Sequence, residues 1–218
     1  MLTLGDHATR AELPAQRRGQ ALSMSDRTLA RLPVTAPSGL VNRHTARAFN
    51  ALWFYRAPRH RRGEIQNLTQ FFHPLDIVGD WNRVYGPRGF CQYQFVVPFG
   101  AEQAFGEAVR LLGTSRHVSS LNVLKRFGPP NRAPLSFPTS GWTLAVDLPV
   151  RAGLDALLRS LDALVLDAGG RLYLAKDSRT DAATLARMYP RLDDFRAVRD
   201  RVDPRRRFVS DLSRRLDL

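Results

Sequence analysis

Two lysines stand out among the residues of this sequence that could do chemistry. Of its 33 basic residues only Lys125 and Lys176 are lysine, and the rest are arginine. Arginine this dominant indicates a GC-rich coding bias. Against that background a retained lysine suggests a place that needs a compact ammonium group rather than a planar guanidinium. Chance survival of the two lysines is the alternative.

Lys125 falls in an expected strand, residues 118–127, whose alternation places it on one face with Leu121, Val123 and Phe127. A charge on an otherwise apolar face is costly unless it is paired or holds an anion. The position therefore predicts contact with an anion or a polar substrate. The alternative is a lysine that projects from the rim of the sheet.

Lys176 directly follows another expected strand, residues 171–175. Segments that follow strands are where functional side chains are commonly displayed. The alternative is a surface pair of Lys176 with Asp177, which would contribute little to stability.

Gln92 and Gln94 lie in a third expected strand, residues 90–97, on the same face as Phe90 and Val96. Each carboxamide offers two donors and an acceptor, so the pair suits the hydroxyl groups of a sugar. A solvent-facing side of an edge strand is the alternative.

The same strand partly matches the octet of RNA-recognition motifs, here residues 88–95. Three observations weaken that match. Cys91, Gln92 and Tyr93 miss the three middle positions, Gln92 replaces an aromatic ring on which a base would stack, and the octet falls on the first strand of its unit rather than the third. An RNA-binding or anionic-surface-binding module is nevertheless the alternative function.

The elements that must position these side chains follow from the spacing of apolar residues. The pattern predicts helices at 40–56, 76–85, 101–112 and 154–168, and strands at 64–72, 90–97, 118–127, 142–148 and 171–175, followed by a helical C-terminal tail. Residues 90–175 then have the order β-α-β-β-α-β. We therefore expect an α+β fold with a large antiparallel sheet of ferredoxin-like order and helices on one face.

Composition narrows the function classes further. The 218 residues carry a net charge of +13, which attracts nucleic acid, anionic lipid or phosphate-bearing substrates. No apolar run approaches the roughly 20 residues of a membrane-spanning helix, and the first residues do not have the pattern of a signal peptide. Cys91 is the sole cysteine, and the five histidines lack metal-ligand spacing. No metal site is expected, and no nucleotide-binding glycine loop is found.

Several stretches resemble the decaprenylphosphoryl-β-D-ribose oxidase family of vanillyl-alcohol-oxidase-like flavoproteins. They are residues 66–76 (QNLTQFFHPLD), 81–83 (WNR), 92–95 (QYQF), 121–123 (LNV), 133–138 (APLSFP), 141–142 (GW), 169–173 (GGRLY), 175–179 (AKDSR), 188–191 (MYPR), 202–204 (VDP) and 210–212 (SDL). The resemblance spans nearly the whole chain.

This resemblance implies an FAD-dependent oxidoreductase that oxidises the 2′-hydroxyl of a polyprenylphosphoryl-ribose, with hydride passing to the flavin. It implies a keto-sugar product for an NAD(P)H-dependent epimerase reductase partner in arabinan precursor synthesis. It places the protein in the cytoplasm or periplasm, where an anionic membrane surface would attract its charge. No nucleic-acid partner is expected.

Matching positions imply that Lys176 is the catalytic residue, lying against flavin and substrate, and that Tyr173 contacts the flavin. The residues implied for the substrate pocket are Phe72, Gln92, Gln94, Leu121, Val123, Lys125, Phe127, Thr143 and Ala145. Three of these depart from the family: Phe72 replaces a tyrosine of some members, Thr143 an asparagine, and Ala145 the cysteine of mycobacterial members. Cysteine-directed covalent inhibition should therefore fail here.

The resemblance also divides the chain. It assigns residues 1–170 to a substrate-binding domain and residues 171–218 to a segment that completes an FAD-binding domain. We expect most of that FAD-binding domain to lie outside this sequence, on an upstream polypeptide for example. The chain alone is then expected to be inactive.

Overall fold

Two long strands form the centre of a four-stranded antiparallel sheet. In the computed structural model, which describes residues 3–23, 28, 30–73 and 78–218, β3 (Phe90–Pro98) pairs with β5 (Gly141–Pro149) over nine residues. β4 (Asn122–Phe127) pairs with the other edge of β5, and the short β6 (Arg171–Leu172) with β3, so the sheet order is β4-β5-β3-β6. Aromatic and β-branched residues in β3 and β5 favour this extended pairing.

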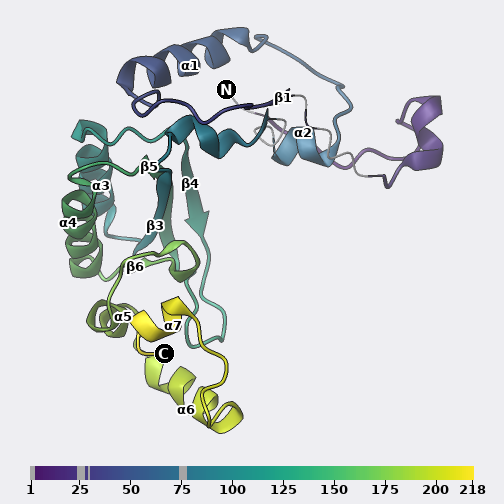
Figure 1. Ribbon diagram of the computed structural model, residues 1–218. Helices are drawn as coiled ribbons and strands as arrows, with labels where there is room; N and C mark the ends of the chain where they lie inside the picture. The colour runs from purple at the N-terminus through teal and green to yellow at the C-terminus, as the bar shows by residue number, and fades with distance from the viewer. Residues whose placement is uncertain (1–2, 24–27, 29, 74–77) are drawn as a thin grey trace. The chain divides into compact units, whose positions relative to one another are not determined.

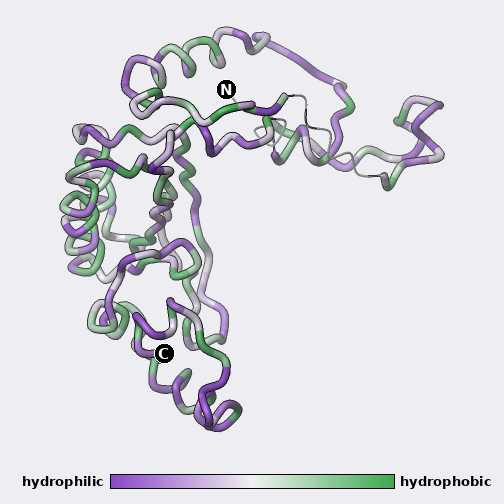
Figure 2. Tube along the Cα trace, in the orientation of Figure 1, coloured by the Kyte–Doolittle hydropathy of each residue, from purple (hydrophilic) through white to green (hydrophobic). Residues whose placement is uncertain are grey.

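Two helices cover one face of the sheet. α3 (Glu102–Thr114) and α4 (Leu154–Asp167) contact each other and lie on the same side of the strands (Figure 1). Hydrophobic and hydrophilic residues alternate along both helices (Figure 2), so each turns an apolar stripe toward the sheet. Phe95 and Leu161 are fully buried in the core that results.

A chain of short elements follows the sheet: η3 (Leu174–Lys176), α5 (Ala182–Met188), α6 (Leu192–Val202) and α7 (Asp211–Arg215). The strand predicted over residues 171–175 is therefore too long, because only Arg171 and Leu172 pair as a strand. The Leu172 amide is 3.0 Å from the Met188 sulfur, and the chain turns into a 3₁₀-helix after Tyr173. Lys176 thus lies at the end of a helical turn rather than directly after a strand.

The chain divides into two compact units, residues 1–87 and 88–218. The first contains η1 (Ala15–Gln20), α1 (Arg43–Arg56), α2 (Leu68–Phe72), η2 (Trp81–Tyr85) and two short parallel strands, β1 (Ala30–Arg31) and β2 (Val78–Gly79). None of the helices among the described residues is long and apolar enough to cross a membrane.

The strand predicted at residues 64–72 is wrong. Asn67 caps the N-terminus of α2, where its side chain accepts from the Gln70 amide and the Gln70 side chain accepts from the Asn67 amide. This reciprocal capping box stabilises a helix start. Of the helix predicted at residues 76–85, residues 81–85 form a 3₁₀-helix, while residues 74–77 lie outside the described part.

The predicted fold class is confirmed at the level of an α+β chain with an antiparallel sheet and several helices. The predicted helices at 40–56, 101–112 and 154–168 correspond to α1, α3 and α4. The ferredoxin-like classification and the domain boundary at residue 170 remain predictions.

Gly141 provides a test of the β3–β5 pairing. A Cβ atom there would lie 2.9 Å from the Val97 carbonyl carbon and 3.0 Å from the Pro98 Cα, both backbone atoms that cannot yield without moving β3. We expect Gly141→Ala to lower the free energy of unfolding by about 2 kcal/mol, the usual cost of overpacking. Gly106→Ala is the control, because nothing surrounds that position in α3 and alanine favours helix. Urea denaturation of both variants checks the contrast, and equal stabilities would contradict it.

Candidate functional site

Polar side chains from three neighbouring strands share the face of the sheet that α3 and α4 leave uncovered. The register sets Gln92 opposite Asp147 and Gln94 opposite Ala145, and on the other edge of β5 it sets Lys125 opposite Thr143. Because residues directly opposite each other project from the same face, both glutamines and Lys125 lie together. The predicted alternation of β3, with Gln92 and Gln94 on one face, is confirmed.

Each glutamine is held by a neighbour on β5. The Gln92 side-chain amide donates to Asp147 Oδ1 at 2.9 Å, and that of Gln94 donates to Thr143 Oγ1 at 3.2 Å. Gln94 and Thr143 are buried, whereas Gln92 is half-buried. These bonds fix the carboxamides in place, since a satisfied buried polar group has little reason to change rotamer.

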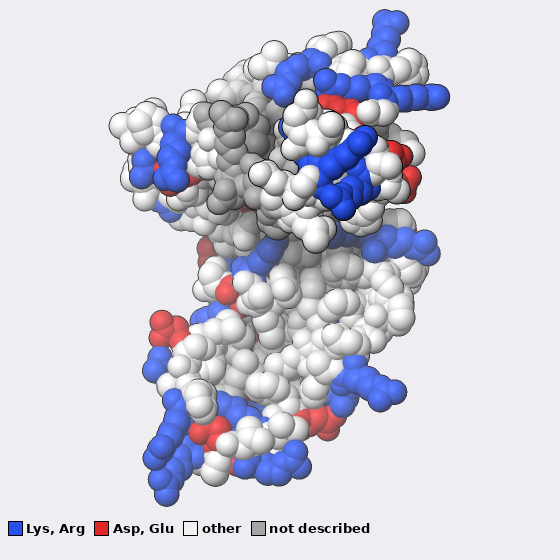
Figure 3. All heavy atoms as spheres, turned by 90° about the vertical axis from the view of Figure 1, so that its right-hand side faces the viewer, with Lys and Arg blue, Asp and Glu red and all other residues white. Residues whose placement is uncertain are grey.

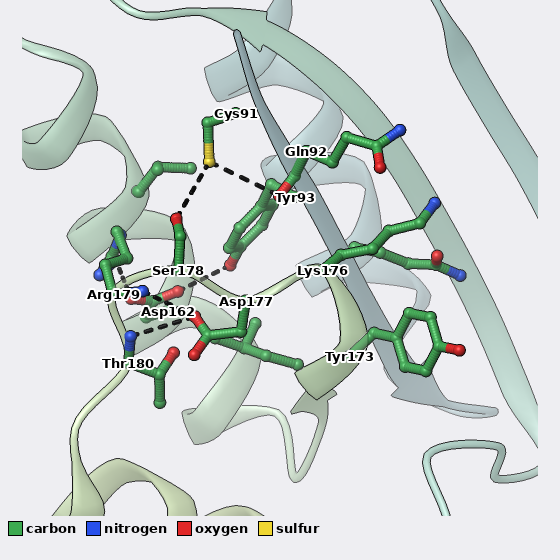
Figure 4. A pocket seen from close by; sticks show the side chains of 13 residues that line it. Cys91, Gln92, Tyr93, Asp162, Tyr173, Lys176, Asp177, Ser178, Arg179 and Thr180 are labelled. Atoms are coloured by element: carbon green, nitrogen blue, oxygen red, sulfur yellow. Dashed lines mark hydrogen bonds and ion pairs between the residues drawn. The ribbon is translucent and has the colours of Figure 1, made fainter. Parts of the chain in front are cut away.

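Lys176 and Tyr173 reach the same face from the segment after β6. Figure 4 shows Gln92, Lys176 and Tyr173 extending toward one side of a pocket, away from Asp162 and Ser178. Lys176 acts electrostatically on Asp147 and lines this pocket together with Gln92 and Gln94. The lysine after the last strand therefore shares a site with the two glutamines.

An aromatic wall borders this face. Tyr173 stacks on Phe137 with ring centroids 4.6 Å apart, and Phe137 meets Phe127 edge-on at 5.6 Å. Phe127 belongs to β4 and Tyr173 follows β6, so the wall joins the two outer strands. Rings of this kind give a polar pocket an apolar side on which a sugar or ring system can pack.

The segment that carries Lys176 is anchored by buried charges. Asp177 Oδ1 accepts from the backbone amides of Arg179 and Thr180 at 3.2 and 3.0 Å, and Arg215 of α7 donates to Asp177 Oδ2 at 2.9 Å. Burial acts to raise the Asp177 pKa, but these hydrogen bonds outweigh it and hold the pKa below its ordinary value. Asp177 therefore stabilises the turn directly after Lys176.

A second cluster closes the far side of the pocket. The Tyr93 hydroxyl donates to Asp162 Oδ1 at 2.9 Å, and Arg179 pairs with Asp162. Burial, followed by the charge of Asp162, raises the Tyr93 pKa well above its ordinary value, so Tyr93 stays a neutral donor. The cluster joins β3, α4 and the turn after Lys176.

Asp147 is the site residue that the sequence reasoning missed. It is 3% exposed, and its Oδ2 has no hydrogen-bond partner in the part of the chain that the structure describes. Burial raises its pKa, opposed by the bond from Gln92 and by the charge of Lys176. The argument applied to Lys125, a charge within an apolar strand, would have found it.

The other predicted pocket residues are distributed as follows. Val123 and Phe127 lie on β4 beside Lys125, which is exposed, and Leu121 precedes the strand, where its carbonyl accepts from the Asp147 amide at 3.2 Å. Ala145 is buried on β5, opposite Val123 of β4 and Gln94 of β3. The contacts of all these residues with substrate or flavin stay predictions.

Phe72 belongs to the other compact unit. It ends α2 in the first unit and is 63% exposed. Its predicted role in the substrate pocket also stays a prediction.

The RNA-recognition match loses its physical basis. Phe95, the last aromatic residue of the octet, is fully buried against the helices, where no base could stack on it. Basic side chains are spread over the face that Figure 3 shows and, in its lower part, border a wide uncharged area.

Replacing Asp147 or Asp177 by asparagine should change the free energy of unfolding in opposite directions. Because the folded-state pKa of Asp147 is raised, its carboxylate weakens the fold as pH rises above the unfolded-state value near 3.8. We expect Asp147→Asn to raise the free energy of unfolding at pH 7 by about 1 kcal/mol, with the gain vanishing near pH 4. Asp177→Asn should lower it at pH 7 by about 1–2 kcal/mol. Urea denaturation at both pH values checks this, and destabilisation by Asp147→Asn would contradict it.

Comparison with known proteins shows what this chain is similar to. Residues 115–216 match the family model described as D-arabinono-1,4-lactone oxidase. Over 217 residues the chain is 48% identical to decaprenylphosphoryl-beta-D-ribose oxidase of Mycolicibacterium smegmatis, covering 100% of this chain and 47% of that protein. It is 39% identical over 223 residues to an uncharacterized protein of Streptomyces coelicolor, covering 98% of this chain and 59% of the relative.

A shorter match is to L-gulono-1,4-lactone dehydrogenase of Mycobacterium tuberculosis, at 36% identity over 93 residues, or 42% of this chain and 22% of that protein. The chain spans about half the length of the first two relatives, 47% and 59%. Similarity to decaprenylphosphoryl-β-D-ribose oxidase thus extends over the whole chain, and residues 115–216 also match the D-arabinono-1,4-lactone oxidase model.

Proposed function

We propose that this chain forms the substrate-binding part of an FAD-dependent oxidase that acts on the 2′-hydroxyl of a polyprenylphosphoryl-ribose. The observation that carries the proposal is the gathering of Gln92, Gln94 and Lys176 on one face of the sheet, in a chain 48% identical to a decaprenylphosphoryl-beta-D-ribose oxidase. A sugar phosphate offers hydroxyl groups to the carboxamides and an anionic end to the ammonium groups.

The second lysine extends the site along the sheet. Lys125 lies on β4 opposite Thr143, and Thr143 in turn holds Gln94. The ammonium groups of Lys125 and Lys176 thus flank the glutamines on the face where a sugar ring would lie. Two cations near one polar patch favour a ligand with a phosphate group, because an ammonium attracts phosphate as a point charge.

FAD, when bound, would accept the hydride that leaves the sugar carbon. Lys176 and Tyr173 fit such a group: the ammonium of Lys176 can balance negative charge on a reduced flavin, and Tyr173 is already held in the aromatic wall by Phe137. Both side chains point to the side of the pocket that the glutamines face. Further flavin contacts would come from sequence outside these 218 residues, on the same or an upstream polypeptide.

The proposed product is a 2′-keto sugar that an NAD(P)H-dependent epimerase reductase would reduce to the arabinose epimer. A lipid-linked substrate also favours action at a membrane surface, to which a net charge of +13 would be attracted if that surface is anionic. Either side of a cytoplasmic membrane suits this proposal.

Flavin reduction tests the oxidase. In the whole protein loaded with FAD, polyprenylphosphoryl-ribose should bleach the flavin absorbance anaerobically. Lys176→Ala should slow this at least about a hundredfold, as expected for removal of a positioned charge at the reacting centre. Arg187→Ala is the matched control, because this cation on α5 is exposed and pairs only with Asp167 among the ion pairs observed.

The chain by itself should hold little flavin and gain activity only when an FAD-binding half is supplied. Failure of polyprenylphosphoryl-ribose to reduce the flavin of the wild-type protein would refute the proposal. Unchanged reduction by the Lys176→Ala variant would refute the role given to that lysine.

A further inference from the structure

The two carboxylate oxygens of Asp147 differ in their hydrogen bonding. Asp147 Oδ1 accepts from Gln92, whereas Oδ2 is buried and has no partner among the described residues. A buried carboxylate oxygen without a hydrogen bond weakens a fold, so its presence needs a reason. The residue lies on the face that also carries Gln94 and Lys176.

Asp177 shows what a purely structural carboxylate looks like in the same unit. Both of its oxygens are used, Oδ1 by two backbone amides and Oδ2 by Arg215. Its pKa is lowered, whereas burial raises that of Asp147. Asp147 is half satisfied, because no described residue donates a hydrogen bond to its Oδ2.

Asp147 also decides which way Gln92 presents its amide. An ionised carboxylate can only accept hydrogen bonds, so the Gln92 NH₂ group must face Asp147, and its Oε1 must point elsewhere. Gln94 is bound in the same sense, with its NH₂ group toward Thr143 Oγ1. The face therefore displays the acceptor oxygens of two carboxamides and one carboxylate.

We infer that Asp147 is a specificity-determining residue that accepts a hydrogen bond from a sugar hydroxyl through Oδ2 and orients Gln92 through Oδ1. A row of acceptors selects a ligand that donates, which is a polyol rather than a deoxy sugar or a ketone. The positive charge of Lys176 favours the ionised form of the buried Asp147 carboxylate. The inference rests on the proposed sugar substrate and names the residue that distinguishes this sugar from its deoxy analogues.

Asparagine at position 147 separates the two roles of this residue. Its Oδ1 can still accept from Gln92, but Oδ2 becomes an NH₂ donor that cannot accept from a hydroxyl. The fold should therefore persist while recognition of the hydroxyl is lost. The matched control is Asp193→Asn, which removes a carboxylate that is 93% exposed on α6.

The test compares the affinities of wild type and Asp147→Asn, each as the full 218-residue chain, for three probes. The probes are β-D-ribofuranosyl phosphate and its 2-deoxy and 3-deoxy analogues. Wild type should bind one deoxy analogue about tenfold more weakly than the parent, the usual cost of one hydrogen bond to a charged group. Asp147→Asn should bind the parent about tenfold more weakly and no longer distinguish it from that analogue.

The inference is overturned if the wild-type chain fails to bind the parent sugar phosphate, or if Asp147→Asn binds it as tightly as wild type. It is also overturned if the variant still discriminates against the same analogue, because a structural effect would weaken all probes equally. These readouts need no flavin. If Asp147→Asn loses discrimination but the sugar does not reduce the flavin of the whole protein, this inference is supported and the proposed oxidase is refuted. If the sugar reduces the flavin but Asp147→Asn still discriminates, the oxidase is supported and this inference is refuted.

Discussion

The pairing of β3 with β5 is the constraint on which the site depends. Nine residue pairs fix which side chains of each strand face α3 and α4 and which face away. A slip of one residue would turn Gln94 toward the helices and Phe95 away from them, because side chains alternate along a strand. Phe95 and Leu144 face each other across this pair in the core, so their burial enforces the register that sets Gln92 opposite Asp147.

The two faces of the sheet thus do different physical work. The face toward α3 and α4 is apolar and close-packed, and it supplies most of the stability through buried residues such as Phe95 and Leu148. The other face collects groups that weaken the fold, above all the unpartnered oxygen of Asp147. Strain of this kind persists only where the surrounding structure over-determines it, and it is common at functional sites.

The sequence predicted the elements of the second unit well because strong periodicity there coincides with burial. It failed where local hydrogen bonding competed with the pattern: the apolar run of residues 64–72 suggested a strand, but the Asn67–Gln70 capping box starts a helix. The faces of Gln92 and Lys125 followed from alternation alone, whereas only the family resemblance joined Lys176 to them before the structure placed it in one pocket with Gln92. Asp147 carries the same signal as Lys125, a charge within an apolar strand, but its bond to Gln92 depends on the pairing of β3 with β5.

Placement of Lys176 depends on residues far along the sequence. β6 ends at Leu172, and without a longer strand to hold it the lysine would be free to turn with its 3₁₀-helix. Asp177, the next residue, is bound by two backbone amides and by Arg215 from α7, which joins the C-terminal part of the chain to the pocket. A long flexible side chain loses conformational entropy when it is positioned. Anchoring its backbone in advance reduces the entropy that must be lost on binding. Arg215, far along the sequence, therefore helps to fix the backbone from which the ammonium group of Lys176 extends.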